Sequence, residues 1–600
     1  MRRAIKPEET YGLKKADGWC LCGTGRGKRT MSEKILQGMR LILTAGACYG
    51  FLRSAMRIFR LRAEFALPVS FAAVGLVMIL GGILGFLLPT AWLLLAAGIG
   101  LAGMSLFYRE SLRPILTPGV LFFFVCAAFF LLLLYGSRLT HVDNFSHWGA
   151  ILRLIESGDA LPEHNRLVYF PAYPTGSSLV IYWFVKMSGI HAEWFWAWVQ
   201  SLLLAACAAP LFCFVEGERA SRPWCLALTL LTALACLCGN TDLTDLLVDT
   251  LVPMLGLAGV LLCLYGRERL TQLTLPLAIL TAYLPMVKNS GYFFAGLLLA
   301  FALCVGGKGA LRWRAFGFMA LALLAANRLW SWHVRTAFDN GLGSYHAVSL
   351  QNFSKSFGMK SAEDLRTITL ALVDALFREG RLVWLALSLA AVLLLCHTAK
   401  ERRLKRLCLA LPVIWALYLV SLLGMYFFSM SVGEAGHAAA FDRYYRIITV
   451  FSTGYLWVQV CLVLPELRRK ARLPAAAAAC ALLLGLCAPR PEYLLRQSRR
   501  MDDSLALRIR FDTLIEERKI PPEQGYLVFS SPEHEILSRV MCTYLLHPTI
   551  TVVCTEPDTM DEDIGRTDYF IILDDTEAAE ALRGRFGTDE PCGWVYDYID

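Results

Sequence analysis

The sequence contains little charge: Asp, Glu, Lys and Arg together make up 18% of its 600 residues. Soluble proteins carry about 25% charged and roughly 45–50% apolar residues. Here the hydrophobic share is 56%, and the mean hydropathy is +0.50. This composition excludes a soluble enzyme, a disordered chain and a fibrous protein.

The sequence also lacks a disulfide framework and a recognisable leader. Most of the 19 cysteines lie inside apolar runs, where a thiol behaves as a small hydrophobic group. Cys20 and Cys22 form a lone pair without a second pair, which disfavours a metal site there. The first 35 residues are polar and basic, so no cleavable signal is expected.

Long apolar runs take the place of the missing charge. Phe65–Phe86, Gly119–Tyr135 and Leu407–Met430 contain no charged residue. Each can cross about 30 Å of hydrocarbon as an α-helix, and none alternates as a barrel strand would. We therefore predict an α-helical polytopic membrane protein. The thirteen expected spans are 65–87, 89–107, 116–136, 193–214, 223–240, 245–264, 272–287, 290–306, 315–332, 381–397, 407–429, 446–465 and 473–489.

Charge divides the chain into parts of opposite sign. Residues 501–600 hold 22 acidic and 8 basic residues, whereas the rest hold 27 acidic and 50 basic ones. We predict a basic cytoplasmic segment at 1–62, a multi-spanning domain at 63–489 and an acidic extracytoplasmic α/β domain at 490–600. The run 41–52 is short and has arginines on both sides, which leaves open an interfacial helix or an additional span.

The acidic tail has the alternating pattern of a small α/β unit. Helical spacing predicts helices at 502–519 and 576–586. Short β-branched or aromatic runs predict strands at 526–530, 549–554, 569–573 and 594–599. The tail has no glycine-rich phosphate loop, so we expect an accessory domain or a structural cap.

Basic residues fall in every second loop between the expected spans. Lys and Arg are retained on the cytoplasmic side of a membrane, which places the N-terminus in the cytoplasm. The loops 137–192 and 333–380 and the acidic tail then face outward. The expected location is the cell membrane, with a bacterial cell envelope as the setting. The cytoplasmic basic residues are Arg109, Arg113, Arg219, Arg222, Arg267, Arg269, Lys308, Arg312, Arg314, Lys400, Arg402, Arg403, Lys405, Arg406, Arg468, Arg469, Lys470 and Arg472.

The first long outer loop holds the residues that best suggest chemistry. Asp143 follows the third expected span within a few residues, and His147 and Trp148 lie close behind it. Aromatic side chains are enriched at headgroup depth, which brings the Asp143 carboxylate near the membrane interface. Further along, Tyr173-Pro174-Thr175-Gly176 predicts a turn where the backbone need not be helical.

The order of the motifs resembles that of the GT-C superfamily of integral-membrane glycosyltransferases, over about residues 120–465. In that family the first loop usually carries two adjacent acids, whereas here Asn144 follows Asp143, which weakens a two-carboxylate metal site. The motifs are Asp143 with His147-Trp148, Tyr173-Pro174-Thr175-Gly176, the acids Asp242, Asp245 and Asp249, Lys288-Asn289-Ser290-Gly291, and Asp442-Arg443-Tyr444.

The resemblance implies a mannosyltransferase- or arabinosyltransferase-like enzyme that uses a polyprenyl-phosphate sugar at the outer leaflet. Such an enzyme moves the sugar, with inversion, to a hydroxyl of a glycan, lipid or protein acceptor. The reaction needs a carboxylate that takes the hydroxyl proton and cations on the departing phosphate. No cofactor besides the donor is assigned, and whether a divalent metal takes part is open.

Candidate roles follow from this comparison. Asp143 is the expected general base, and Asp245 is a second acid for which Asp242 and Asp249 compete. Lys288 and Arg443 are expected to bind the donor phosphate. His147, Trp148 and Tyr173 are the loop residues expected on the acceptor side. The structural alternatives are a helix cap for Asp143, helix starts for the later acids, an aqueous-facing Lys288, and an Arg443 paired with Asp442 or Glu434.

Two other functions fit a polytopic protein with long outer loops. One is a transporter or flippase for lipid-linked saccharides, and the other is a polysaccharide polymerase or ligase. A transporter is expected to show internal repeats and charges deep in its spans, whereas here the acids fall in outer loops. A non-catalytic scaffold that presents the acidic tail is a further alternative. Membrane topology explains the basic residues, so no nucleic-acid partner is expected.

Overall fold

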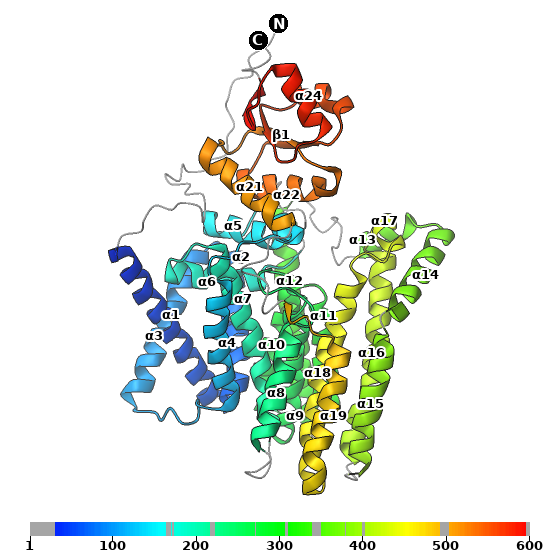
Figure 1. Cartoon of the computed structure of the whole chain (residues 1–600). Helices are drawn as coiled ribbons and strands as arrows, with labels where there is room; N and C mark the ends of the chain where they lie inside the picture. Colours follow the sequence, from blue (N-terminus) through cyan, green and yellow to red (C-terminus); the bar gives the residue numbers. More distant parts are fainter. Residues whose placement is uncertain are drawn as a thin grey trace.

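The computed structural model describes residues 31–595, except 164–169, 171–172, 216–221, 271, 306–309, 339–349, 379, 399–401 and 493–502. Two parts are visible in Figure 1: a bundle of long helices, and a small domain that contains the sheet and sits on one end of the bundle. The predicted helical class and C-terminal sheet are therefore confirmed.

The bundle consists of helices whose apolar side chains face one another or the surroundings. They are α1 (Met31–Ile58), α2 (Ala63–Ile83), α3 (Leu87–Phe107), α4 (Pro118–Leu134), α7 (Glu193–Ala208), α8 (Arg222–Leu237), α9 (Leu251–Tyr265), α10 (Thr274–Val287), α11 (Gly291–Val305), α12 (Ala310–Ala337), α15 (Arg381–Thr398), α16 (Arg402–Phe428), α18 (Phe441–Val463) and α19 (Arg469–Cys487).

Eight helices of the described chain are long and apolar enough to cross a membrane. They begin at Met31, Ala63, Leu87, Glu193, Arg381, Leu404, Phe441 and Arg469. Five more apolar helices, α4, α8, α9, α10 and α11, are shorter. Each of the thirteen predicted spans falls on a helix, but the number of membrane crossings stays a prediction.

Helix α1 differs from the prediction of a short segment at 41–52. It continues for 28 residues and packs along α3. The basic residues that interrupt the apolar run are hydrogen-bonded inside the bundle: Arg40 donates to the carbonyls of Lys186 and Met187, and Arg53 pairs with Glu110 at 2.6 Å. Because their charges are satisfied, the helix does not end at them.

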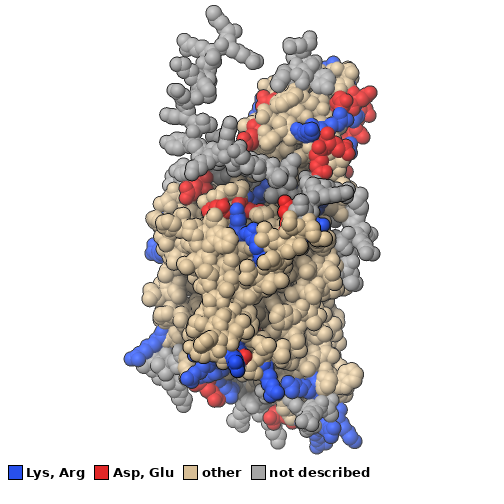
Figure 2. All heavy atoms as spheres, turned by 90° about the vertical axis from the view of Figure 1, so that its left-hand side faces the viewer, with Lys and Arg blue, Asp and Glu red and all other residues tan. Residues whose placement is uncertain are grey.

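The path of α1 also bears on the expected topology. Arg40, near its start, contacts the end of α6 (Gly176–Ser188), close to the end of the bundle that carries the C-terminal domain. Residues 1–30, whose cytoplasmic location was expected, lie outside the described residues. Lys and Arg side chains gather at the opposite end of the bundle in Figure 2. Which compartment each end faces stays a prediction.

Short helices cover the end of the bundle near the C-terminal domain. They are a π-turn, η1 (Asn144–Trp148), with α5 (Gly149–Gly158), α6, α13 (Leu350–Gly358), α14 (Ala362–Arg378) and α17 (Val432–Gly436). The predicted outer loops 137–192 and 333–380 thus contain helical segments of their own, joined by irregular stretches.

The C-terminal domain is a four-stranded sheet with helices. The strand order is β2-β1-β3-β4, in which β1 pairs in parallel with β2 and β3, and β4 is antiparallel to β3. Every residue of β1 is buried, as expected for a parallel strand covered on both faces. The last strand begins two residues earlier than predicted, and most of the predicted range 594–599 lies outside the described residues. The elements are α21 (Asp503–Arg518), β1 (Gly525–Phe529), α22 (Glu535–Leu546), β2 (Ile550–Cys554), α23 (Met560–Ile564), β3 (Tyr569–Ile572), α24 (Glu577–Phe586) and β4 (Cys592–Trp594).

Candidate functional site

Four segments far apart in the sequence bring two carboxylates and two cations together. Asp143 lies between α4 and η1, Asp249 lies between α8 and α9, Lys288 directly follows α10, and Arg443 is in the first turn of α18. We call these four residues the acid–cation cluster. It combines three predicted site residues with Asp249, one of the two acids that competed with Asp245.

Asp143 and Arg443 form the more exposed half of the cluster. Nη1 of Arg443 donates to Oδ2 of Asp143 at 2.5 Å, and their side chains are 24% and 32% exposed, respectively. Burial acts to raise the pKa of Asp143, but the charge and hydrogen bond of Arg443, with smaller effects of His141 and Lys288, hold that pKa below its ordinary value. Asp143 is therefore ionised at neutral pH in a charge-assisted hydrogen bond.

Asp249 and Lys288 form the buried half. Nζ of Lys288 donates to Oδ1 of Asp249 at 2.6 Å. Nε of Arg443 lies 3.6 Å from Oδ2 of Asp249, beyond hydrogen-bond distance. Neither of these last two atoms has a hydrogen-bond partner within the described part of the chain. Arg443 thus stands between two carboxylates and is hydrogen-bonded to only one.

The start of α18 is held so that both cations meet one aromatic ring. Nζ of Lys288 and Cζ of Arg443 each lie 5.4 Å from the centroid of Tyr444, a cation–π distance. The Tyr418 hydroxyl of α16 donates to the carbonyl of Tyr444 at 2.8 Å, and the Asn240 amide donates to the carbonyl of Arg443 at 2.9 Å. These bonds fix the direction in which Arg443 points.

The turn after Asp143 is a π-turn, a geometry that often occurs at functional sites. Its Asn144 amide donates to Oδ1 of Asp245 at 2.9 Å and accepts from the backbone N–H of Leu246 at 3.0 Å. Burial and the neighbouring Asp242 hold the pKa of Asp245 well above its ordinary value. Asp245, the predicted second acid, therefore fastens the loop, while Asp249 contacts the cations.

His147, Trp148 and Tyr173 form an aromatic group beside the cluster. The His147 ring centroid lies 4.7 Å from that of Trp148 and 4.9 Å from that of Tyr173. Burial, together with the nearby Tyr444 and Asp249, raises the pKa of Tyr173, so its hydroxyl stays protonated. Nowhere in the described residues do three His, Cys, Asp or Glu side chains come together to hold a metal ion.

The structural alternative for Arg443 was an ion pair with Asp442 or Glu434. Among the described residues Arg443 instead pairs with Asp143 and Asp249. Asp442 instead pairs with three arginines, Arg381, Arg446 and Arg490. Sequence reasoning did not single out Asp249, and its only signal was its place as the last of three acids before α9.

No protein-family model, curated protein or solved structure matches the chain, so the acid–cation cluster itself is the basis for assigning a function.

Proposed function

We propose that the protein is a membrane glycosyltransferase that moves a sugar from a polyprenyl-phosphate donor to a hydroxyl acceptor at the non-cytoplasmic face, with inversion. The observation that carries this proposal is the meeting of Asp143 and Arg443, 2.5 Å apart, next to the Lys288–Asp249 pair. Transfer from a phosphate needs both a proton-accepting carboxylate and cations in one site.

In this proposal Lys288 and Arg443 receive the donor phosphate. A guanidinium binds phosphate oxygens in bidentate geometry, so phosphate competes with the carboxylate of Asp143 for Arg443. Nε of Arg443 is buried and has no hydrogen-bond partner in the described chain, so it can donate to a phosphate that enters the cluster. When the bond between sugar carbon and phosphate oxygen breaks, its electron pair stays on the phosphate, and the two cations stabilise that charge.

Asp143 takes the proton of the acceptor hydroxyl. Its pairing with Arg443 lowers its pKa, which makes it a weak base in that state. Once phosphate engages Arg443, this attraction weakens and Asp143 becomes a stronger base. The acceptor oxygen attacks the sugar carbon from the face opposite to the phosphate, and a single displacement inverts that carbon.

The test is complementation of a deletion strain, with mass spectrometry of its envelope glycans. The wild-type chain is expected to restore a sugar that the deletion removes, whereas Asp143→Asn and Arg443→Gln are not, at equal amounts of protein in the membrane. Asp374→Asn, at an acid whose side chain is 65% exposed on α14, is the matched control and should restore the sugar. Full restoration by Asp143→Asn would refute the proposal.

A transporter for an anionic lipid-linked sugar is the second candidate. The specific observation in its favour is the Lys288–Asp249 pair, whose side chains are 9% and 1% exposed, because buried charges within a bundle often mark substrate pathways. An assay in detergent distinguishes the transferase from the transporter. The purified chain is incubated with a panel of polyprenyl-phosphate hexoses and pentoses and a glycan acceptor. Release of polyprenyl phosphate supports transfer, because a transporter has no compartments to act on there.

A further inference from the structure

The C-terminal domain is joined to the bundle through a buried group of charges. Arg508 of α21 donates from Nη2 to Oε1 of Glu193 at 3.0 Å, from Nη1 to the carbonyl of Leu139 at 3.2 Å, and from Nε to Asp512. The side chains of Arg508 and Glu193 are 4% and 9% exposed. Arg138 also pairs with Asp512. Buried charges are tolerated only in well-fixed, hydrogen-bonded geometry, so this contact has one defined arrangement.

Tyr544 of α22 adds a second set of contacts. Its hydroxyl donates to Oε1 of Glu193 at 2.8 Å, the same oxygen that accepts from Arg508. Its ring centroid lies 5.2 Å from that of Phe145 in the π-turn. We call Arg138, Glu193, Arg508, Asp512 and Tyr544 the docking cluster.

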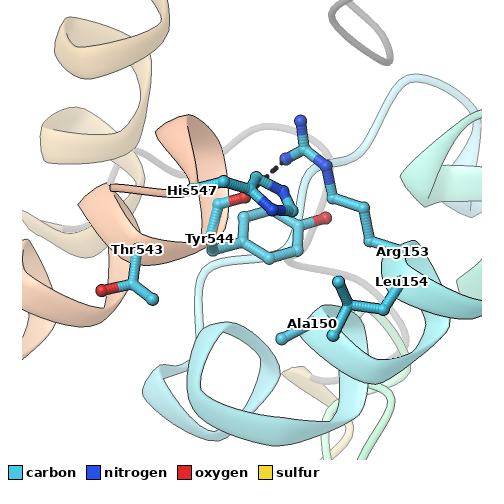
Figure 3. Close-up of a pocket in the computed structure, with 6 residues that line it drawn as sticks. All are labelled: Ala150, Arg153, Leu154, Thr543, Tyr544 and His547. Atoms are coloured by element: carbon cyan, nitrogen blue, oxygen red, sulfur yellow. Dashed lines mark hydrogen bonds between the residues drawn. The ribbon is translucent and has the colours of Figure 1, made fainter. Parts of the chain in front are cut away.

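A third contact lies at a small hollow between α5 and α22 (Figure 3). Arg153 reaches across it, and its Nη1 donates to the carbonyl of Tyr544 at 2.7 Å. Its guanidinium carbon also lies 4.9 Å from the centre of the Tyr544 ring. The end of α22 is therefore bonded to α5 as well as packed against the π-turn.

These contacts flank the candidate base on both sides in the sequence. Leu139, four residues before Asp143, accepts from Arg508 through its carbonyl and donates its N–H to Oε2 of Glu193 at 2.9 Å. Phe145, two residues after Asp143, is fully buried against Tyr544. The C-terminal domain thus touches the segment 138–148 both before and after Asp143.

We propose that Arg508 and Tyr544 are positioning residues, through which the C-terminal domain holds segment 138–148 so that Asp143 faces Arg443. The docked domain is then a working part of the site rather than an appended module. This inference rests on the proposed function only for the reaction that Asp143 performs. The hold on segment 138–148 is a property of the fold and is tested separately.

The first test is hydrogen–deuterium exchange on the full-length chain in detergent. In Arg508→Met, the amides of 138–148 are expected to exchange at least about tenfold faster, whereas those of α9 and α18 keep the wild-type rate. Arg508→Lys should recover part of the protection. Arg510→Gln, at an exposed arginine of the same helix, is the matched control and should change nothing. Tyr544→Phe, which keeps the ring and loses one hydrogen bond, decides the question if Arg508→Met does not fold.

The second test is the pH dependence of sugar transfer. A loosened segment weakens the Asp143–Arg443 pair that lowers the pKa of Asp143. The acid limb of the rate profile should therefore move to higher pH in Arg508→Lys and Tyr544→Phe. A merely structural role would lower the amount of folded protein and leave that limb in place. Unchanged exchange of 138–148 in a chain whose α22 is deprotected would overturn the inference, even if Asp143→Asn abolishes transfer. Retained sugar transfer in Asp143→Asn would instead refute the proposed function and leave the positioning of segment 138–148 untouched.

Discussion

The docking cluster and the acid–cation cluster both combine acidic and basic side chains, and in the sequence Arg138 of the first lies five residues before Asp143 of the second. Their hydrogen bonding differs. In the docking cluster, Arg508 donates to two carboxylates and a carbonyl, and its side chain is 4% exposed. In the acid–cation cluster, Arg443 is hydrogen-bonded to one carboxylate, lies 3.6 Å from the other, and is 24% exposed. Complete bonding fixes a structure, whereas a partly exposed guanidinium with one nitrogen left unbonded among the described residues leaves a place for a ligand.

The largest effect is expected from a substitution that breaks the docking cluster. Arg508→Met leaves the carboxylates of Glu193 and Asp512 buried without their main cation, at a cost of about 3–5 kcal/mol. The C-terminal domain should then separate from the bundle, which limited proteolysis would report as release of a fragment close to 503–600. Resistance equal to the wild type would show that the apolar contacts of Phe145 suffice for docking.

The next largest effect is expected in the acid–cation cluster. Arg443→Gln is expected to lower the initial rate of sugar transfer about 10²–10³-fold, the usual loss when one donor to a developing oxyanion is removed. The unfolding temperature should change little, because Arg443 is partly exposed and Lys288 still neutralises Asp249. Loss of both activity and folding would mean that this group, too, is structural.

A smaller effect depends on pH. The pKa of Asp245 is raised in the folded state by burial and by Asp242. Its protonated form therefore favours folding at low pH, and this contribution is lost as the pH rises through the folded-state pKa. Asp245→Asn should raise the unfolding temperature at pH 8, and the difference from the wild type should shrink toward pH 4. A constant difference across this range would contradict the assignment.

The smallest effect is expected at an exposed ion pair, and it provides a baseline for the other measurements. Arg378 and Asp374 form an exposed pair on α14, with side chains 70% and 65% exposed. Arg378→Gln should change the free energy of unfolding by less than about 0.5 kcal/mol and leave transfer unaffected. Rates in Arg378→Gln membranes then set the scatter against which the loss in Arg443→Gln is judged.

Much of the bundle follows from the apolar runs alone, because each run is long enough to require a helix. The convergence of Asp143, Lys288 and Arg443 was also predictable in outline, since the alternation of basic loops assigns all three to one end of the bundle. The choice of Asp249 over Asp245 was not, because three acids share one short loop. Only packing decides that Asn144 takes Asp245 and leaves Asp249 for Lys288.

The docking cluster left no mark in the sequence. Glu193 and Arg508 are 315 positions apart, and each looks like an ordinary charged residue in the first turns of a helix. Their pairing depends on how two separately folded parts meet, which no local spacing encodes. The extent of α1 was missed for a related reason: Arg40 and Arg53 look like boundaries until their distant partners are known.

Asp442 and Arg443 are neighbours at the start of α18, so their side chains leave the helix about 100° apart. One of them is pinned by arginines from α15, α18 and the segment after α19, and the other by acids of two connecting loops. Rotation of α18 about its axis would break the ion pairs that these two residues make with α15, the segment after α19 and the two loops, whereas the Asp442–Arg446 pair lies within α18 and would remain. We therefore expect α18 to stay fixed while a substrate enters, and the loops that carry Asp143 and Asp249 to move.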